Sequence, residues 1–351
     1  MAEKHGGDWA GYLQQYGREP LDFSANVSPF GLPEGVRQAV IDALSGAERY
    51  PDPQCRALRA ALAAHLSLPE AYILCGNGAA DLIWRLAGAL RPERALLTAP
   101  TFGEYAAALR SVGCEIRHYT LNPSDLRVRE DILTEITEGT DILFLCEPNN
   151  PTGLTTDHAL LQRILDRCRA CGCLLVVDEC FNDFLDDPDA HTMAGELAGG
   201  GLMILRAFTK FYGMAGLRLG YGLCANRDLL DRMAAAGQSW AVSIPAQAAG
   251  IAALREKDYA ASLRALIPRE RRRLSQGLVQ LGFKVIPGEA NYLLFYSDDH
   301  NLAAKLKARG VLLRDCASYE GLGPGWYRAA VKGEADNGRF LEILREVVDH
   351  G

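Results

Sequence analysis

Short apolar runs alternate with amphipathic stretches of helical periodicity through the middle of this chain of 351 residues. Such alternation predicts an α/β fold with a mostly parallel sheet that is covered by helices on both faces. The strands are expected at residues 72–75, 95–98, 142–146, 174–178, 202–208 and 221–224. Ligands bind outside the carboxyl ends of the strands in such sheets. Residues with chemical capacity end or follow five of these strands: Gly76, Phe102, Asn150, Asp178 and Lys210.

The pattern changes after about residue 239, which predicts a second, smaller α+β domain over residues 239–351. This domain is expected to contain a helix interrupted at Pro268, a helix at 302–309, and strands at 283–286, 291–296, 311–314 and 326–331. Residues 35–238 would form the large domain. Residues 1–34, which are rich in glycine and proline, would form an arm that packs on the small domain or on a partner subunit.

Composition excludes several classes of protein. A net charge of −7 and an isoelectric point near 5.6 argue against nucleic-acid binding, and the basic run ERRRL at 270–274 is expected to be a solvated helix face. No run approaches the ~18 apolar residues of a membrane span, and the N-terminus lacks a signal-peptide core, so we expect a soluble, cytoplasmic protein. The ten cysteines are expected as reduced, buried thiols. Cys168, Cys171 and Cys173 cluster without a histidine, so no metal site is expected.

The run TKFYGMAGLRLG at residues 209–220 places a lysine beside a hydroxyl and eight residues before an arginine. Once its amine is desolvated, Lys210 could form a Schiff base with a carbonyl carbon. Thr209 and Arg218 could hold an anionic tail, Arg218 through its planar guanidinium. This combination suits an aldehyde cofactor that carries a phosphate, although a single Thr-Lys pair is more often a solvated surface feature.

The run CGNGAADLIWRL at residues 75–86 places glycines between a strand and a helix. The backbone amides of Ala79 and Ala80 and the positive end of the helix would form an anion cradle, unless this is an ordinary strand-to-helix turn. The third glycine of a dinucleotide-binding loop and the acidic residue after the next strand are missing, which disfavours a nicotinamide oxidoreductase. Neither a GxxxxGK[ST] loop nor a GxSxG elbow occurs.

Three further residues have alternative interpretations. Asp178 ends an apolar strand, so its carboxylate needs a partner, such as a protonated pyridine nitrogen, or it caps the next turn. Asn150 in EPNNPTG could donate to a phenolate oxygen, or it could simply form a turn. Phe102 in APTFGEY could stack on a flat ring, or it could belong to the core.

Together these positions resemble, in order and spacing, the fold-type I pyridoxal-phosphate enzymes of the aspartate aminotransferase superfamily, nearly end to end. The resemblance implies that Lys210 is the Schiff-base lysine, Asp178 the partner of the pyridine nitrogen, Asn150 the donor to the O3′ oxygen and Phe102 the stacking ring. The phosphate cup would be formed by Gly78, Ala79, Ala80, Thr209 and Arg218. Tyr50 in ERYPDP resembles the tyrosine that reaches the partner's phosphate in a homodimer. Phe181 stands where aminotransferases carry a tyrosine that bonds O3′.

Within that superfamily the chain resembles the histidinol-phosphate aminotransferases and, more closely, the L-threonine O-3-phosphate decarboxylases of cobalamin biosynthesis. The motifs that carry this resemblance are HGGD at 5–8, LDFSANVSPFG at 21–31, RYPDP at 49–53, TKFY at 209–212, DECF at 178–181 and LLRDCASYEGL at 312–322. The implied reaction is decarboxylation of threonine phosphate to (R)-1-amino-2-propanol O-phosphate. Decarboxylation of serine phosphate, transamination of histidinol phosphate, and a binding protein without catalysis are the alternatives.

The substrate would need two anion sites. Arg328 in WYRAAV resembles the arginine that binds the α-carboxylate, and the candidates for the phosphate end are His5, Asn26, Arg314 and Lys332. Two positions depart from the decarboxylase pattern: Asp8 stands where asparagine is expected, and Lys332 stands where arginine is expected. A lysine offers a point charge in place of a bidentate fork.

Overall fold

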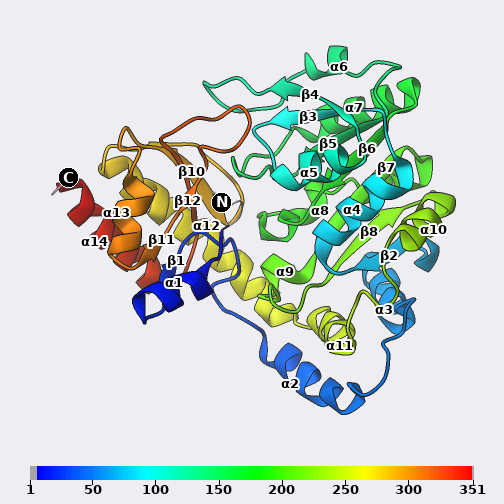
Figure 1. Ribbon diagram of the computed structural model, residues 1–351, viewed down its shortest axis with the longest axis horizontal. Helices are drawn as coiled ribbons and strands as arrows, with labels where there is room; N and C mark the ends of the chain where they lie inside the picture. The colour runs from blue at the N-terminus through cyan, green and yellow to red at the C-terminus, as the bar shows by residue number, and fades with distance from the viewer. Residues whose placement is uncertain (1–5, 350–351) are drawn as a thin grey trace.

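The structure is a computed structural model that describes residues 6–349. A seven-stranded sheet forms the centre of a large lobe, on the right in Figure 1, in the strand order β2-β8-β7-β6-β5-β3-β4. The inner strands pair in parallel, whereas β8 runs antiparallel to both of its neighbours. The predicted α/β fold with a mostly parallel sheet is therefore confirmed. The strands are β2 (Ile73–Gly76), β3 (Arg94–Ala99), β4 (Glu115–Thr120), β5 (Ile142–Cys146), β6 (Leu174–Asp178), β7 (Leu202–Ala207) and β8 (Gly220–Cys224).

Both faces of this sheet are covered by apolar helix faces. Along β5, Ile142 and Phe144 face one hydrophobic cluster, and Leu143 and Leu145 face the other. Burial on both sides explains why the central strands are unbroken apolar runs. One face is covered by α4 (Gly78–Leu90), α5 (Gly103–Ser111) and α10 (Arg227–Ala236). The other is covered by α3 (Arg56–Leu66), α7 (His158–Cys171) and α11 (Ile244–Ala253), with α2 (Glu34–Ala43) outside them. Short helices complete this lobe: η1 (Leu44–Gly46), η2 (Glu70–Tyr72), α6 (Ile132–Glu135), η3 (Asn182–Phe184), α8 (Pro188–His191), η4 (Ala194–Gly199) and α9 (Phe208–Phe211).

The small lobe is built on an antiparallel sheet in the order β12-β13-β10-β9. Its strands are β9 (Lys284–Val285), β10 (Tyr292–Tyr296), β12 (Arg314–Asp315) and β13 (Trp326–Ala330). The N-terminal segment contributes α1 (Trp9–Tyr16) and β1 (Leu21–Asp22), and β1 pairs in parallel with β11 (Val311–Leu312). The helices α12 (Lys257–Gln280), α13 (Leu302–Ala308) and α14 (Glu334–Asp349) pack with these strands around a separate core.

Several expectations need correction. The edge strand β4 was not predicted, because its sequence EIRHYT has no apolar run and half of its residues are exposed. The expected strand at 311–314 is two strands in different sheets, and Phe208 begins α9 instead of ending β7. Helix α12 continues through Pro268.

The division between the lobes and the basic run also differ from expectation. Helix α11 packs on the large lobe's core, although residues 239–351 were expected to form the small domain. The run at 270–274 is only partly solvated, because Glu270 and Leu274 are buried in α12 and the Arg271 guanidinium donates to the carbonyl of Glu289 at 2.6 Å. None of the described helices is long and apolar enough to cross a membrane.

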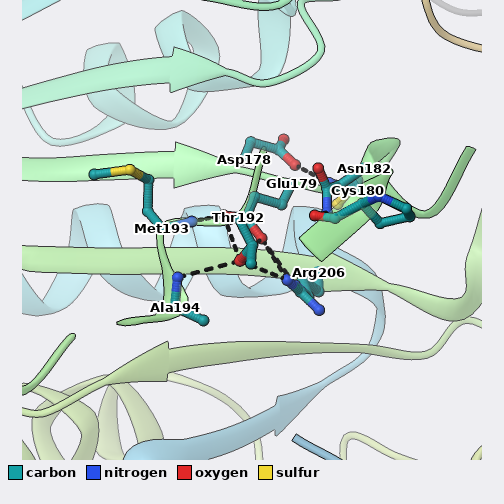
Figure 2. A network of polar contacts seen from close by, with 9 residues as sticks. Asp178, Glu179, Cys180, Asn182, Thr192, Met193, Ala194 and Arg206 are labelled. Atoms are coloured by element: carbon teal, nitrogen blue, oxygen red, sulfur yellow. Dashed lines mark hydrogen bonds and ion pairs between the residues drawn. The ribbon is translucent and has the colours of Figure 1, made fainter. Parts of the chain in front are cut away.

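A buried polar network holds the end of β6, where Figure 2 shows Asp178 and Glu179 pointing in different directions. The Glu179 side chain is fully buried, and its Oε2 accepts hydrogen bonds from Arg206 Nη2 at 2.7 Å and Arg206 Nε at 3.0 Å. The Thr192 hydroxyl donates to the same oxygen at 2.9 Å, and the Met193 amide donates to Oε1 at 2.8 Å. These partners compensate the buried negative charge of Glu179, and they hold the backbone beside Asp178 in place.

Removing the cation of this network should be costly. We expect Arg206→Met to lower the free energy of unfolding by about 3 kcal/mol, because it leaves a buried carboxylate unpaired. Urea unfolding followed by circular dichroism measures this change. Arg163→Met is the matched control, because Arg163 pairs with Glu130 at the surface, where both side chains are at least half exposed. Equal effects of the two substitutions would contradict a stabilising role for the Glu179 network.

Candidate functional site

A cavity of about 390 Å³ lies between the lobes, at the carboxyl ends of β5, β6 and β7. Residues from both lobes and from the N-terminal segment line it, so sequence positions about 300 apart meet here. The predicted site residues that line the cavity are Asn26, Ala79, Ala80, Phe102, Asn150, Asp178, Phe181, Thr209, Lys210, Arg218, Arg314 and Arg328.

One wall of the cavity is built for an anion. The first turn of α4 begins at Gly78, whose φ of +81° favours glycine. A Cβ on Gly78 would lie 2.8 Å from Arg218 Nη2, and a Cβ on Gly220 would lie 2.6 Å from the backbone nitrogen of Ala79. Glycine at both positions therefore lets the guanidinium and the β8 backbone approach the helix start closely. With the Thr209 hydroxyl, these groups form a phosphate-sized cradle at a positive helix end.

Lys210 follows β7 on α9, beside this cradle. Burial lowers the pKa of its amine to about 8, and the nearby guanidiniums of Arg328 and Arg218 act in the same direction. A larger fraction of the amine is therefore neutral near physiological pH than for a solvated lysine. A neutral amine is the form that attacks a carbonyl carbon.

Asp178 also lines the cavity, and 5% of its surface is exposed. The Tyr105 hydroxyl donates to its Oδ2 at 2.6 Å, and the Cys180 amide donates to its Oδ1 at 3.0 Å. Burial raises the pKa of this carboxyl, while the donors from Cys180 and Tyr105 oppose the rise. Within residues 6–349 no salt bridge neutralises it. A buried carboxylate with donors but no cation is suited to a cationic ligand.

Asn150 and Arg328 meet on the other side of the cavity. Arg328 Nη1 donates to the amide oxygen of Asn150, and Arg328 Nη2 donates to the carbonyl of Ser24 at 3.0 Å. The oxygen of Asn150 is thus engaged, which leaves its amide nitrogen to donate elsewhere. Arg328 Nε and Asn26 Oδ1 are among the buried polar atoms that have no partner in the described part of the chain. Both belong to residues that line the cavity, so their unmet capacity can be met by a ligand.

Two buried arginines face each other across the small lobe's strands. Arg314 on β12 stands directly opposite Arg328 on β13, and each is only 6% exposed. Aromatic rings lie close to both: the Tyr319 ring centre is 5.6 Å from the Arg314 guanidinium carbon, and the Tyr292 ring centre is 5.4 Å from that of Arg328. Like charges directly opposite in an antiparallel pair repel. The pair therefore favours a ligand with more than one negative charge.

Phe102 and Phe181 line the cavity with hydrocarbon surface. The Phe102 ring meets Tyr105 edge-on, with ring centres 5.5 Å apart. The Phe181 ring meets Tyr292 edge-on at 5.0 Å. Phenylalanine at position 181 has no hydroxyl, so it provides no hydrogen bond to a bound ring.

Tyr50, Lys332 and Asp8 do not line the cavity. Tyr50 is 78% exposed and stacks on Trp240, with ring centres 4.5 Å apart. Lys332 does not line the cavity; burial lowers the pKa of its amine, and Asp22 is the first of the charges that oppose this. Asp8 caps α1 by accepting from the Gly11 amide at 3.1 Å, and it lines a neighbouring cavity. His5 lies outside the described residues.

Tyr105 and Tyr319 were missed at the sequence level. Tyr105 stands three residues after Phe102, and this spacing places both on one side of the start of α5. That spacing was the available signal for Tyr105. Tyr319 lies in a loop between β12 and β13, and no local pattern indicates that its ring lies beside Arg314.

Comparison with known proteins agrees with this geometry. The family model for aminotransferase class I and II matches residues 18–344. The threonine-phosphate decarboxylase of Salmonella typhimurium is 39% identical over 98% of this chain and 96% of its own length. Histidinol-phosphate aminotransferase 2 of Archaeoglobus fulgidus is 32% identical over 94% of each chain.

Among solved structures, the histidinol-phosphate aminotransferase of Clostridium acetobutylicum superimposes with a TM-score of 0.88 at 26% identity. The match covers 94% of this chain and 99% of that one. Fold, site and near full-length similarity agree, and the chain belongs to the aminotransferase class I and II family.

Proposed function

We propose that this protein is a pyridoxal-phosphate-dependent decarboxylase of L-threonine O-3-phosphate, which produces CO₂ and (R)-1-amino-2-propanol O-phosphate for cobalamin biosynthesis. The observation that carries the proposal is the facing pair of Arg314 and Arg328 beside Lys210. A substrate with an α-carboxylate and a side-chain phosphate supplies two anionic groups to these two cations. The 39% identical relative, named for this activity, supports the same choice.

The donor set of the cavity fits pyridoxal phosphate. The phosphate would be held by Gly78, Ala79, Ala80, Thr209 and Arg218, at the start of α4. Asp178 supplies the negative charge for the ring nitrogen, and Asn150 has an amide nitrogen free to donate to O3′. Phe102 offers an aromatic face, and Lys210 offers an amine for the aldehyde. When bound, this cofactor supplies a cationic ring that accepts the electron pair of a breaking bond at the substrate's Cα.

The chain's own residues would decide which bond breaks. Only the Cα bond that stands perpendicular to the ring plane overlaps with the ring's π electrons, so the grip on the substrate selects it. Arg328 would bind the α-carboxylate, and Arg314 and Asn26 would bind the phosphate end. The Lys210 amine, with its lowered pKa, is the group that would hold and deliver a proton at Cα.

Transamination of histidinol phosphate is the second candidate, supported by the 32% identical relative. Histidinol phosphate carries one anionic group, its phosphate, and no carboxylate. It would bring one anionic group to two arginines that stand directly opposite each other and repel. Threonine phosphate and serine phosphate each carry two anionic groups, one for each of the two arginines. The arginine geometry therefore favours a phosphorylated amino acid.

We also propose a homodimer that functions in the cytoplasm. Tyr50 and Trp240 form an exposed stacked pair, and Ile41 and Leu44 near the end of α2 are 53% and 57% exposed. A second copy that covers these side chains would remove this apolar surface from water. Tyr50 would then reach the partner's phosphate cradle. All ten cysteines are free thiols, as a reducing compartment requires.

Product analysis tests the proposed reaction. With pyridoxal phosphate present, we expect CO₂ release from threonine phosphate without any keto acid. Arg314→Gln should lower kcat/KM about a hundredfold, because it removes charge-assisted hydrogen bonds to the substrate. The exposed Arg345→Gln should leave it unchanged. Transamination of histidinol phosphate with 2-oxoglutarate, with no CO₂ from either phosphoamino acid, would refute the proposal, and CO₂ from serine phosphate alone would change the substrate.

The lowered pKa of Lys210 predicts how cofactor uptake depends on pH. The neutral fraction of this amine should rise as pH increases through about 8. The rate at which added pyridoxal phosphate forms its visible absorbance with the apoprotein should therefore rise with the same midpoint. Lys210→Ala should show no such absorbance. A midpoint near that of free lysine would show that the amine is solvated.

The proposed dimer can be tested through Tyr50. Sedimentation equilibrium should give twice the chain mass. Tyr50→Ala should weaken cofactor binding about tenfold, because it removes a hydrogen bond to a charged phosphate. Tyr16→Ala is the matched control, since Tyr16 is also exposed and stacks on Tyr12, but lies on α1. A monomer at working concentration, or unchanged affinity in Tyr50→Ala, would contradict the proposal.

A further inference from the structure

Tyr105 contacts two groups that face the cavity while remaining fully buried itself. Its hydroxyl donates to Asp178 Oδ2 at 2.6 Å. Its ring meets the edge of Phe102, with ring centres 5.5 Å apart, and it also stacks on Phe144, with ring centres 4.8 Å apart and planes 16° apart. The stack on a β5 core residue leaves the ring little freedom. Tyr105 therefore holds the positions of both the carboxylate and the stacking ring.

The hydrogen bond from Tyr105 affects the charge state of Asp178. Asp178 receives one backbone donor, the Cys180 amide, and no cation within residues 6–349. The side chain and amide of Cys180 and the tyrosine hydroxyl therefore stabilise its ionised form together. Burial raises the pKa of Tyr105 well above its ordinary value, so the hydroxyl stays protonated and remains a donor.

The neighbouring carboxylate of Glu179 is compensated in a different way. Glu179, one residue later, is neutralised within the protein by Arg206. Asp178 instead has hydrogen bonds from uncharged groups, which stabilise negative charge without supplying a counter-ion. This leaves the charge of Asp178 available to a cation in the cavity.

We propose that Tyr105 is a positioning residue that keeps Asp178 ionised and directed at the cofactor's ring nitrogen while fixing the Phe102 ring beside it. The proposal rests on the proposed cofactor site, but it does not depend on which substrate is used. In an acid–base pair between a carboxyl and a pyridine nitrogen, donors to the carboxylate favour the ionic arrangement, with the proton on nitrogen. Without the Tyr105 hydroxyl, the proton should shift toward Asp178.

Tyr105→Phe tests this with the ring preserved. In holoenzyme prepared with cofactor isotope-labelled at the ring nitrogen, nitrogen NMR should move toward the signal of a neutral pyridine. We expect kcat to fall about tenfold, the effect of one charge-assisted hydrogen bond. Asp178→Asn serves as the reference for a nitrogen that has lost its carboxylate partner.

Tyr119→Phe is the matched control, because the hydroxyl of Tyr119, on edge strand β4, also donates to a carboxylate, that of Asp131. Neither residue lines the cavity. This substitution should leave the nitrogen signal and kcat as in wild type. If Tyr105→Phe lowers only thermal stability while the nitrogen signal stays cationic, the positioning role is wrong and Tyr105 is structural. If Asp178→Asn also leaves the signal unchanged, the proposed cofactor site itself fails, which separates the two hypotheses.

Discussion

The site depends on a carboxylate that the apolar strand β6 carries into the protein interior. A buried charge is stable only when something compensates it. At the end of β6 two adjacent carboxylates are compensated in different ways. Glu179 has an arginine, a threonine and a backbone amide of the protein itself. Among residues 6–349, Asp178 has only neutral donors. The first arrangement fixes the backbone, and the second leaves a negative charge available at a fixed position.

The arginines around the cavity are also buried charges that a ligand can compensate. Arg314 and Arg328 face each other across two short strands, and the Nε of Arg328 is buried without a protein partner among the described residues. The nearby guanidinium of Arg328 also helps to lower the pKa of Lys210. The like charges of the two arginines repel one another, which favours the binding of an anion between them. Functional sites commonly give up folding stability for complementarity to a ligand in this way.

Much of the large lobe could be predicted because its strands are buried on both faces. The runs at 142–146 and 174–178 coincide with β5 and β6. Of the five residues expected at the strand ends, Phe102, Asn150, Asp178 and Lys210 line one cavity, whereas Gly76 does not. Edge strand β4 has no such signal, since its exposed positions are polar. Local sequence also could not reveal the Arg314–Arg328 register or the Tyr105–Asp178 bond. Both join residues from separate elements, so they depend on how the chain folds back on itself.

The two lobes divide the chemistry between them. The large lobe supplies the groups suited to the cofactor, at the helix start of α4 and the strand ends of the parallel sheet. The small lobe supplies Arg314 and Arg328, while the N-terminal segment adds Asn26 and the Ser24 carbonyl that orients Arg328. Among the described residues, Asn150 connects the two sets, because its amide oxygen is bonded to Arg328 while its amide nitrogen is available to a cofactor. Arg328 also acts on the large lobe, since its charge helps to lower the pKa of Lys210. In the proposed function, residues of the large lobe would hold the cofactor, and the arginines of the small lobe would select the bond that breaks. Such a division of roles would let decarboxylases and aminotransferases share one cofactor site.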